Sequence, residues 1–259
     1  MAGRPHIDIW LTYYQDILDG RLLADFHRLL SEEERVQQRR FYFADDRQRY
    51  LVTRALVRTT LSRYAPVEPT AWVFSKNGHG RPEIAREHVE ATGLCFNVSH
   101  TRGLIALGVT RRCALGVDVE NLASREVSLG IAERFFSPIE VAELAAVPPE
   151  RRHDRFFEYW TFKESYIKAR GMGLALPLDR FSFRYPDERS VRIEIDAELG
   201  DDPGRWGFWQ FRPNPQYLLA VCCERPASEP ATLTLYRTVP TVGDELLATP
   251  VLRSTEGCC

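Results

Sequence analysis

Two stretches of this chain carry the same helix signals in the same order. The first reads "LLSEEE" followed by "DRQRYLVTRALVRTTL", and the second reads "FFSPIE" followed by "DRFFEYWTFKESYIKA". Ser31 with Glu34, and Ser137 with Glu140, have the Ser-x-x-Glu spacing of a helix capping box. Each stretch therefore predicts a short capped helix followed by a long one. The repeat favours a chain built from two similar α+β halves.

This repeat divides the chain into three parts. We predict an N-terminal α+β half over residues 1–114, a C-terminal α+β half over residues 115–225, and a loosely structured extension over residues 226–259. Two such halves paired across a pseudo-two-fold axis form an intramolecular dimer, so we expect the chain to be a monomer in solution. The junction between the halves is a favoured place for a ligand cleft.

The composition excludes several classes of protein. The 259 residues are 44% hydrophobic and 27% charged, which is typical of a globular protein. The formal net charge of −2 gives no electrostatic basis for a dedicated nucleic-acid binder. The start "MAGRPHIDIW" has no apolar signal region, no apolar run of about 18 residues occurs, and the six cysteines lack zinc-site spacing. We expect a cytoplasmic protein with reduced thiols and no membrane partner.

The stretch "LGVDVE" places two carboxylates on one face of a predicted strand. Side chains alternate between the faces of a strand, so Asp118 and Glu120 share one face while the leucine and the valines share the other. Adjacent carboxylates repel each other unless a cation lies between them. A solvated edge strand is the plain alternative, and the spacing alone does not decide between the two.

A further acid lies on the apolar face of the second long helix. Phe157, Trp160, Glu164 and Lys168 fall on one helical stripe, since they follow each other at steps of three or four residues. Glu164 thus lies where the aromatic residues favour burial, and it needs a partner there. The ordinary explanation is an exposed pair of Glu164 with Lys168, worth roughly 0.3–0.5 kcal/mol.

Together, Asp118, Glu120 and Glu164 form a candidate metal site with oxygen ligands only. Such ligands suit Mg²⁺ or Mn²⁺ better than Zn²⁺, and Mg²⁺ in proteins commonly binds substrate phosphates as well. Lys163 and Lys168, with arginines of the N-terminal half, supply positive charge for those phosphates. These residues predict a metal-dependent reaction on a pyrophosphate or a similar anion.

Three segments of the chain closely resemble the signature segments of a known family. "FNVSHT", "LGVDVE" and "WTFKESYIKARGMGL" resemble those of the 4'-phosphopantetheinyl transferases, in the larger, surfactin-synthetase-activating subfamily. The likeness runs in order from about "RRFYF" to "YLLAVCCE", and a W-x-x-K-E-x-x-x-K helix preceded by a G-x-D-x-E strand is a specific combination. The resemblance implies a pseudo-dimeric α+β fold that binds coenzyme A between its halves.

The resemblance also implies an activity. The family moves the phosphopantetheine arm of coenzyme A to a serine hydroxyl of an apo acyl, peptidyl or aryl carrier protein and releases adenosine 3',5'-bisphosphate. It implies that Mg²⁺ binds to Asp118, Glu120 and Glu164, the acids already selected from their chemistry. Lys168 matches a lysine near the pyrophosphate, and Lys163 belongs to the same sequence element.

The resemblance assigns further residues to coenzyme A. Arg49 and His100 match positions associated with its 3'-phosphate, while Ser99 and the turn that carries Arg81 would lie near its nucleotide. The family commonly reads G-K-P at this turn, whereas this sequence has arginine in place of the lysine. The change is mild if the backbone or the charge is what matters.

Two acids are candidates for the general base that removes the proton of the carrier serine. Glu164 is the preferred one, because it belongs to the predicted acidic site. Glu140 has been considered as the base in this family and is the second choice, because its capping-box position explains it without any catalysis.

Two other functions remain open from the residues alone. A Mg²⁺-dependent phosphohydrolase could use the same three acids without a protein acceptor. A non-catalytic module that binds coenzyme A or a carrier protein could instead pair the acids with Lys163 and Lys168. Such a module would bind its ligand equally well in the presence of a chelator.

Overall fold

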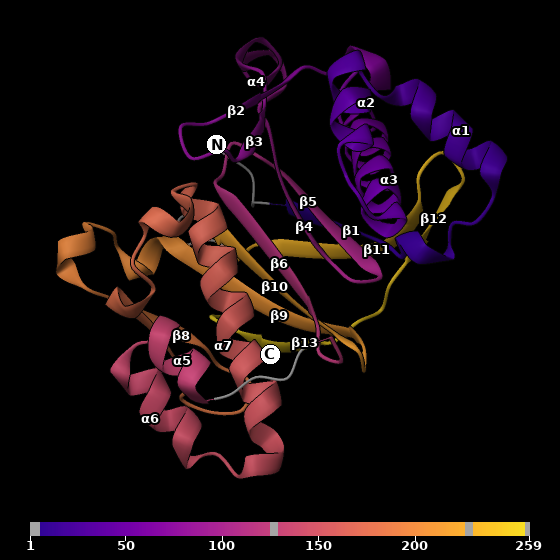
Figure 1. The fold of residues 1–259 in the computed structure, drawn as a ribbon. Coiled ribbons are helices and arrows are strands. Elements are labelled where there is room, and N and C mark those ends of the chain that lie inside the picture. Colours follow the sequence, from indigo (N-terminus) through magenta and orange to yellow (C-terminus); the bar gives the residue numbers. More distant parts are fainter. Residues whose placement is uncertain (1–5, 125–128, 226–229, 257–259) are drawn as a thin grey trace.

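The structure, a computed structural model, describes residues 6–124, 129–225 and 230–256 (Figure 1). Its strands are β1 (His6–Thr12), β2 (Phe74–Lys76), β3 (Pro82–Ile84), β4 (Leu94–Thr101), β5 (Leu104–Arg111), β6 (Leu115–Asn121), β7 (Phe181–Arg184), β8 (Arg192–Ile195), β9 (Trp206–Asn214), β10 (Tyr217–Glu224), β11 (Thr232–Val239), β12 (Gly243–Leu246) and β13 (Val251–Ser254). Its α-helices are α1 (Gly20–Leu29), α2 (Glu32–Arg39), α3 (Ala44–Leu61), α4 (Arg86–Thr92), α5 (Leu129–Phe135), α6 (Pro138–Ala146) and α7 (Pro149–Arg170). None of the described helices is both long enough and apolar enough to cross a lipid bilayer.

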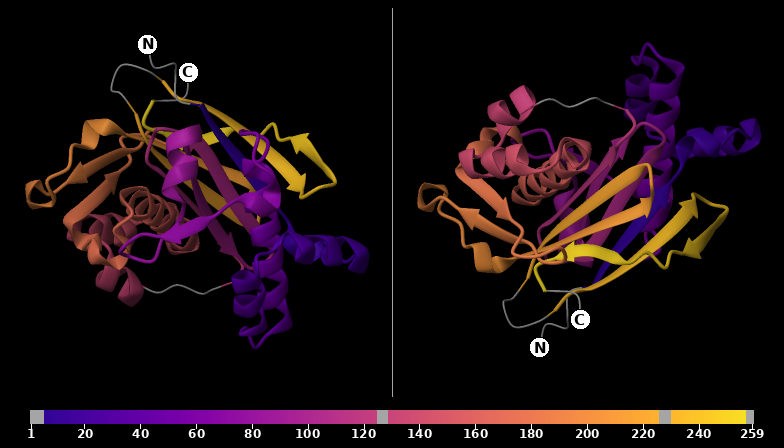
Figure 2. Two further views of the ribbon diagram at one scale, coloured as in Figure 1. Left: turned by 90° about the horizontal axis from the view of Figure 1, so that it is seen from above. Right: turned by 90° about the horizontal axis from the view of Figure 1, so that it is seen from below.

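Two sheets and the helices packed on them form two halves with a shared core. The first sheet has the strand order β12-β11-β1-β5-β4 and the second has the order β13-β9-β10-β6. Helix α3 packs on the first sheet and helix α7 on the second, and Figure 1 and Figure 2 show the strands between these two groups of helices. A third apolar cluster joins the sheets through residues such as Ile9, Val117 and Leu219. This is the predicted α+β architecture of two halves.

The helix signals of the sequence appear at the predicted places. Ser31 and Ser137 are the N-caps of α2 and α6, and the glutamate of each capping box, Glu34 or Glu140, accepts the backbone N–H of its serine. Helix α7 ends at Gly171, whose φ of +66° lies in the left-handed region that favours glycine.

The glutamate of each capping box also holds a cation from the long helix of its own half. In the N-terminal half, Glu34 accepts hydrogen bonds from Arg54 and Arg58, at 2.6 and 3.0 Å. In the C-terminal half, Glu140 lies 2.8 Å from Lys163, and neither side chain has any exposed surface. A buried charge is costly without a partner, and each half supplies the partner by the same pairing of helices.

The two cations also satisfy backbone groups in equivalent ways. Arg58 donates to carbonyl oxygens of the turn that precedes β2, and Lys163 donates to carbonyl oxygens of the segment that leads into β7. Both side chains thus occupy the same place in the repeated pattern. The equivalence indicates that the buried pair of Glu140 and Lys163 fixes helix packing in its half.

Side chains of β4 join the edge of β6 to the other half of the molecule. Alternate backbone amides of β6 donate to side-chain oxygens of alternate residues of β4, at 2.8–3.3 Å. The pairs are Val117 with Asn97, Val119 with Ser99, and Asn121 with Thr101. An unpaired strand edge leaves its amides without partners, and these side chains supply them. Strand β6 therefore lies at the junction of the two halves.

Strand β6 and helix α7 lie in direct contact because residue 116 is a glycine. A Cβ atom at Gly116 would lie 1.8 Å from the carbonyl oxygen of Ser165 and 2.5 Å from the amide nitrogen of Ala169. Any larger residue would push the helix away from the strand. This close approach sets how near the acids of β6 come to the helix.

Residues 230–256 do not form a loosely structured extension, and the expectation was wrong for this part of the chain; residues 226–229 and 257–259 lie outside the described residues. Strand β11 pairs in parallel with β1 and completes the first sheet, with β12 at its edge. Strand β13 pairs with β9 and extends the second sheet. Pairing between strands from opposite ends of the chain leaves no short-range signal in the sequence. Strands beyond residue 225 thus belong to both sheets. The domain boundaries at residues 114 and 225 stay a prediction.

We predict that Gly116→Ala destabilises the protein, because the added methyl group would overlap the backbone of α7. The free energy of unfolding should fall by about 1–3 kcal/mol or more, measured by denaturant unfolding. Gly20→Ala is the matched control, because apart from its chain neighbours and its own helix backbone nothing lies within 4 Å of a Cβ at Gly20. Equal stability of the two variants would contradict the close packing of β6 on α7.

We predict that Lys163→Met lowers the free energy of unfolding by about 3–5 kcal/mol, because it leaves the Glu140 carboxylate buried without its cation. The double variant Lys163→Met with Glu140→Gln should recover part of this loss, since the buried charge is then removed as well. Thermal denaturation of the two variants and the wild type measures both effects. A Lys163→Met variant as stable as the wild type would show that the packing does not depend on the pair.

Candidate active site

Strand β6 presents its two carboxylates toward helix α7. Leu115, Val117 and Val119 lie in the apolar cluster between the sheets, whereas Asp118 and Glu120 contact side chains of the helix. The alternation predicted from the sequence is therefore confirmed. The alternative of a solvated edge strand is wrong, because every residue of β6 is buried.

Lys168 of helix α7 links three elements at one point. Its ammonium group lies 2.7 Å from Asp118 Oδ1 on β6 and 2.8 Å from Ser99 Oγ on β4. It also donates to the carbonyl oxygen of Val117, at 3.1 Å. The hydroxyl of Ser99 donates to the same Asp118 oxygen, at 3.0 Å. Lys168 therefore forms its ion pair with Asp118 within the C-terminal half, and it contacts the N-terminal half through Ser99.

Glu164 and Trp160 face the same acids from helix α7. Burial raises the pKa of Glu164, and the Asp118 carboxylate raises it further, while Lys168 acts in the opposite direction. Trp160 Nε1 donates to Glu120 Oε1 at 3.1 Å. The helical stripe predicted from spacing thus brings an acid, a lysine and an indole donor to β6. The sequence located Trp160 on this stripe but gave no signal that its N–H would meet a carboxylate.

The site offers acidic oxygens that suit a divalent cation, but they are not gathered into a closed ligand set. Over residues 6–124, 129–225 and 230–256, no group of three or more His, Cys, Asp or Glu side chains is arranged to hold a metal ion. Lys168 occupies Oδ1 of Asp118, whereas Oδ2 is buried and has no hydrogen-bond partner. Such an oxygen is costly, and the Asp118 carboxylate adds to the effect of burial in raising the pKa of Glu164, which indicates that the two acids lie near each other. Both observations fit a cation such as Mg²⁺.

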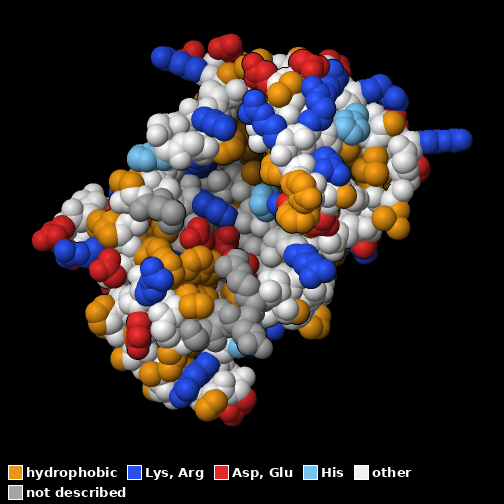
Figure 3. Space-filling model, viewed as in Figure 1, with side chains coloured by type: hydrophobic (Ala, Val, Ile, Leu, Met, Phe, Trp, Pro, Cys, Tyr) orange, Lys and Arg blue, Asp and Glu red, His pale blue; other side chains and the backbone are white. Residues whose placement is uncertain are grey.

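His100 and Arg49 lie on the N-terminal side of the site. The protein packed around the imidazole lowers the pKa of His100, although the residue keeps exposed surface, and the Arg49 guanidinium and the Lys168 ammonium lower it further. Asp46 holds Arg49 at 2.6 Å. Figure 3 shows acidic, basic and histidine side chains gathered in a hollow between the two halves. The positive charge that His100 experiences indicates a place where an anion would be favoured.

The structure does not bring Glu140 or Lys163 to this site. Their ion pair lies fully buried in the core of the C-terminal half. Consecutive residues of an α-helix point about 100° apart, so Lys163 does not share the face of Glu164. The repeat was the signal that could have placed this pair, because the capping-box glutamate of the other half also takes a cation from its long helix.

Arg81 lies beside the site, but its guanidinium contacts protein backbone. Nη1 donates to the carbonyl oxygens of Lys168 and Ala169 at the end of α7. Nη2 donates to the carbonyl oxygen of Leu115 at 3.0 Å and to that of Phe96 at 3.4 Å. The sequence indicated that this arginine belongs near the site, but its backbone partners depend on tertiary structure.

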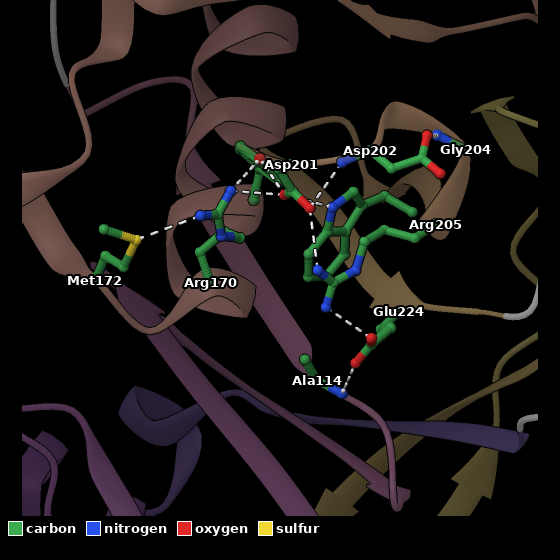
Figure 4. Close-up of polar contacts among 10 residues, drawn as sticks. Ala114, Arg170, Met172, Asp201, Asp202, Gly204, Arg205 and Glu224 are labelled. Atoms are coloured by element: carbon green, nitrogen blue, oxygen red, sulfur yellow. Dashed lines mark hydrogen bonds and ion pairs between the residues drawn. The ribbon is translucent and has the colours of Figure 1, made fainter. Parts of the chain in front are cut away.

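A second network, which carries no sequence motif, holds the last turn of α7 from the other side (Figure 4). The buried Asp201 carboxylate accepts hydrogen bonds from Tyr166 and Arg170 of α7, both at 2.6 Å, and from Trp206 at 2.8 Å. These donors hold the pKa of Asp201 below its usual value although burial acts in the opposite direction. Arg205 continues the contacts from Asp201 to β10.

Comparisons with known proteins cover both halves of the chain. Residues 114–222 match the family described as "4'-phosphopantetheinyl transferase superfamily". Residues 21–111 match the family described as "4'-phosphopantetheinyl transferase, N-terminal". The two matches meet where β5 passes into β6, the strand that carries the carboxylates.

Curated relatives match over most of their length. A 4'-phosphopantetheinyl transferase of Bacillus subtilis is 34% identical over 197 residues, which are 76% of this chain and 83% of that protein. The 4'-phosphopantetheinyl transferase Sfp of Bacillus subtilis (strain 168) is 34% identical over 201 residues, 78% of this chain and 85% of that protein. The 4'-phosphopantetheinyl transferase HetI of Nostoc is 37% identical over 153 residues, 59% of this chain and 64% of that protein.

Similarity to a solved structure is lower. The holo-[acyl-carrier-protein] synthase (AcpS) of Thermotoga maritima matches with a TM-score of 0.35 and 18% identity, covering 43% of this chain and 62% of that chain. The family assignment does not depend on this match, because the sequence relatives and the two matched halves establish it. The chain belongs to the 4'-phosphopantetheinyl transferase family.

Proposed function

We propose that this transferase moves the 4'-phosphopantetheine of coenzyme A to a serine hydroxyl of an apo acyl, peptidyl or aryl carrier protein, with Mg²⁺ or Mn²⁺ bound. The observation that carries the proposal is that Lys168 pairs with Asp118 at the junction of the halves, with Glu164 near both of these side chains. Glu120, on the same face of β6, accepts a hydrogen bond from Trp160 of the same helix. Carboxylates beside a fixed ammonium group suit a diphosphate whose charge is shared with a divalent cation.

We assign the cation to Asp118, Glu120 and Glu164. The buried Oδ2 of Asp118 supports this assignment, because it lacks a hydrogen-bond partner. When bound, the cation would supply positive charge to diphosphate oxygens as the bond to the leaving group breaks. Trp160 orients Glu120 through its indole donor, as groups behind metal ligands commonly do.

Glu164 is the group that we expect to accept the proton of the carrier serine. Its carboxylate lies near Asp118 and Lys168 at the proposed reaction site, where it can accept a proton directly or through a water molecule. Glu140 is less suited, because its carboxylate is fully buried and is occupied by Lys163 and by backbone amides. Lys168 stabilises the negative charge that develops on the departing adenosine 3',5'-bisphosphate.

Arg49 and His100 are the residues that we expect to bind the 3'-phosphate of coenzyme A. Burial lowers the pKa of His100 first, and the Arg49 and Lys168 charges lower it further; a bound phosphate would offset those charges. Ser99 contributes by holding Lys168 and Asp118 in place. Lys163 has no exposed surface, so its expected role is structural and not coenzyme binding.

We predict that Asp118→Asn and Glu164→Gln each lower the transfer rate by at least about 100-fold while the protein stays folded. The assay incubates each variant with coenzyme A, Mg²⁺ and an apo carrier protein and follows the intact mass of the carrier. Glu150→Gln is the matched control, because Glu150 is an exposed carboxylate at the other end of α7. Full activity of either site variant would contradict the assignment.

The same assay separates the alternative functions. A phosphohydrolase would release phosphopantetheine or phosphate without a carrier protein, and a non-catalytic module would leave the mass of the carrier unchanged. A chelator of divalent cations should stop transfer, and added Mg²⁺ or Mn²⁺ should restore it. Undiminished transfer in the presence of the chelator would overturn the proposed requirement for a divalent cation but not the transferase activity.

A further inference from the structure

We propose that Arg81 is a positioning residue that locks the last turn of α7 onto β4 and β6 and thereby holds Lys168 at Asp118. The proposal rests on the proposed function, because it concerns the lysine that we expect to act in the transfer. It differs from the sequence-based expectation that Arg81 binds the nucleotide. The guanidinium is directed at the protein's own backbone, where the three elements that carry the site come together.

The hydrogen bonds of Arg81 reach all three elements. Nη1 donates to the carbonyl oxygens of Lys168 and Ala169 on α7, and Nη2 donates to that of Leu115 on β6 at 3.0 Å and to that of Phe96 on β4 at 3.4 Å. Lys168, Asp118 and Ser99 lie on these same elements. One side chain therefore connects the backbones on which the reacting groups depend.

An arginine suits this place for two physical reasons. The last four carbonyl groups of a helix have no partner within the helix, and a positive charge is favoured beside them. The guanidinium is a planar fork with several donors, so it reaches carbonyl groups in different directions, whereas a lysine offers one nitrogen atom. Burial lowers the pKa of Arg81, but a guanidinium in a protein stays protonated.

The turn that carries Arg81 is itself fixed against the end of the helix. Asn77 Oδ1 accepts the backbone amides of His79 and Arg81, at 2.9 and 3.0 Å, and Asn77 Nδ2 donates to the carbonyl oxygen of Gly171 at 3.0 Å. A Cβ atom at Gly171 would lie 3.3 Å from Asn77 Nδ2 and 3.5 Å from Arg81 Nη1. The end of α7 and the turn that carries Arg81 are therefore in close contact, and the hydrogen bonds of Asn77 hold this turn in place.

Lys168 is thus held at both ends. Its ammonium group contacts Asp118 and Ser99, and its carbonyl oxygen accepts a hydrogen bond from Arg81. Loss of the guanidinium would loosen the backbone at Lys168, which would keep the hydrogen bond from the Gly171 amide, without removing the charge of Lys168. Small misplacements of a catalytic group lower the rate of the chemical step more than they weaken substrate binding.

The experiment compares Arg81→Met and Arg81→Lys with the wild type, measuring kcat and the KM for coenzyme A in the carrier assay. Arg81→Met should lower kcat by about 10- to 100-fold with little change in KM. Arg81→Lys should recover part of this loss, because it keeps the charge at the helix end. Hydrogen exchange of the backbone amides of residues 165–171, measured without substrates, should be faster in Arg81→Met than in the wild type.

The matched control is Arg58→Met, which removes another buried guanidinium that donates to backbone carbonyl groups, in the N-terminal half. It should lower stability while leaving kcat near the wild-type value. An equal loss of kcat in Arg58→Met at an equal loss of stability would overturn the proposal in favour of general destabilisation.

Other outcomes also decide the question. A raised KM with unchanged kcat in Arg81→Met would overturn the proposal and assign the side chain to coenzyme A. Unchanged exchange at residues 165–171 would show that Arg81 does not hold the helix end. If Arg81→Met fails to fold, the same measurements on Arg81→Lys decide the question. If Arg81 holds the end of α7, hydrogen exchange at residues 165–171 should be faster in Arg81→Lys as well. A wild-type protein without transfer activity would contradict the proposed function. The hydrogen-exchange experiment would still test whether Arg81 holds the end of α7.

Discussion

The close approach of strand β6 to helix α7 is the constraint on which the rest of the structure depends. It requires that residue 116 has no side chain, because the helix backbone occupies the space of a Cβ. The helix can then bring Glu164 and Lys168 to the carboxylates of β6. Its last turn is held from two sides, by Arg81 from the N-terminal half and by Asp201 from the C-terminal half. The position of Lys168 therefore reflects contacts with both halves of the molecule.

The duplicated architecture separates packing from chemistry. Each half uses a capping-box glutamate to hold a cation from its long helix, Glu34 with Arg58 and Glu140 with Lys163. The residues that we propose for the chemistry lie elsewhere, at the junction where β4 supplies side-chain partners to the edge of β6. A glutamate at a motif position can thus be structural, and its counterpart in the other half is the evidence for that role.

Local periodicity predicted the centre of the site. Asp118 and Glu120 followed from alternation along a strand, and Glu164 and Lys168 followed from spacing along a helix, because these patterns repeat over a few residues. The partners of Arg81 could not be predicted in this way, since they are carbonyl groups on distant segments. The same reason explains the missed pairing of β11 with β1, which joins the two ends of the chain. Capping signals predicted the helix starts because they are local.

A crystal structure of the protein with coenzyme A and Mg²⁺ tests the central claim most directly. That claim is that acids from a strand and from a distant helix, brought together by the contact at Gly116, share one divalent cation that binds a diphosphate. The account predicts a cation within about 2.1 Å of an oxygen of Asp118, Glu120 and Glu164, and also of the diphosphate. A cation held only by the diphosphate and water, with Glu164 turned away from it, would contradict the account.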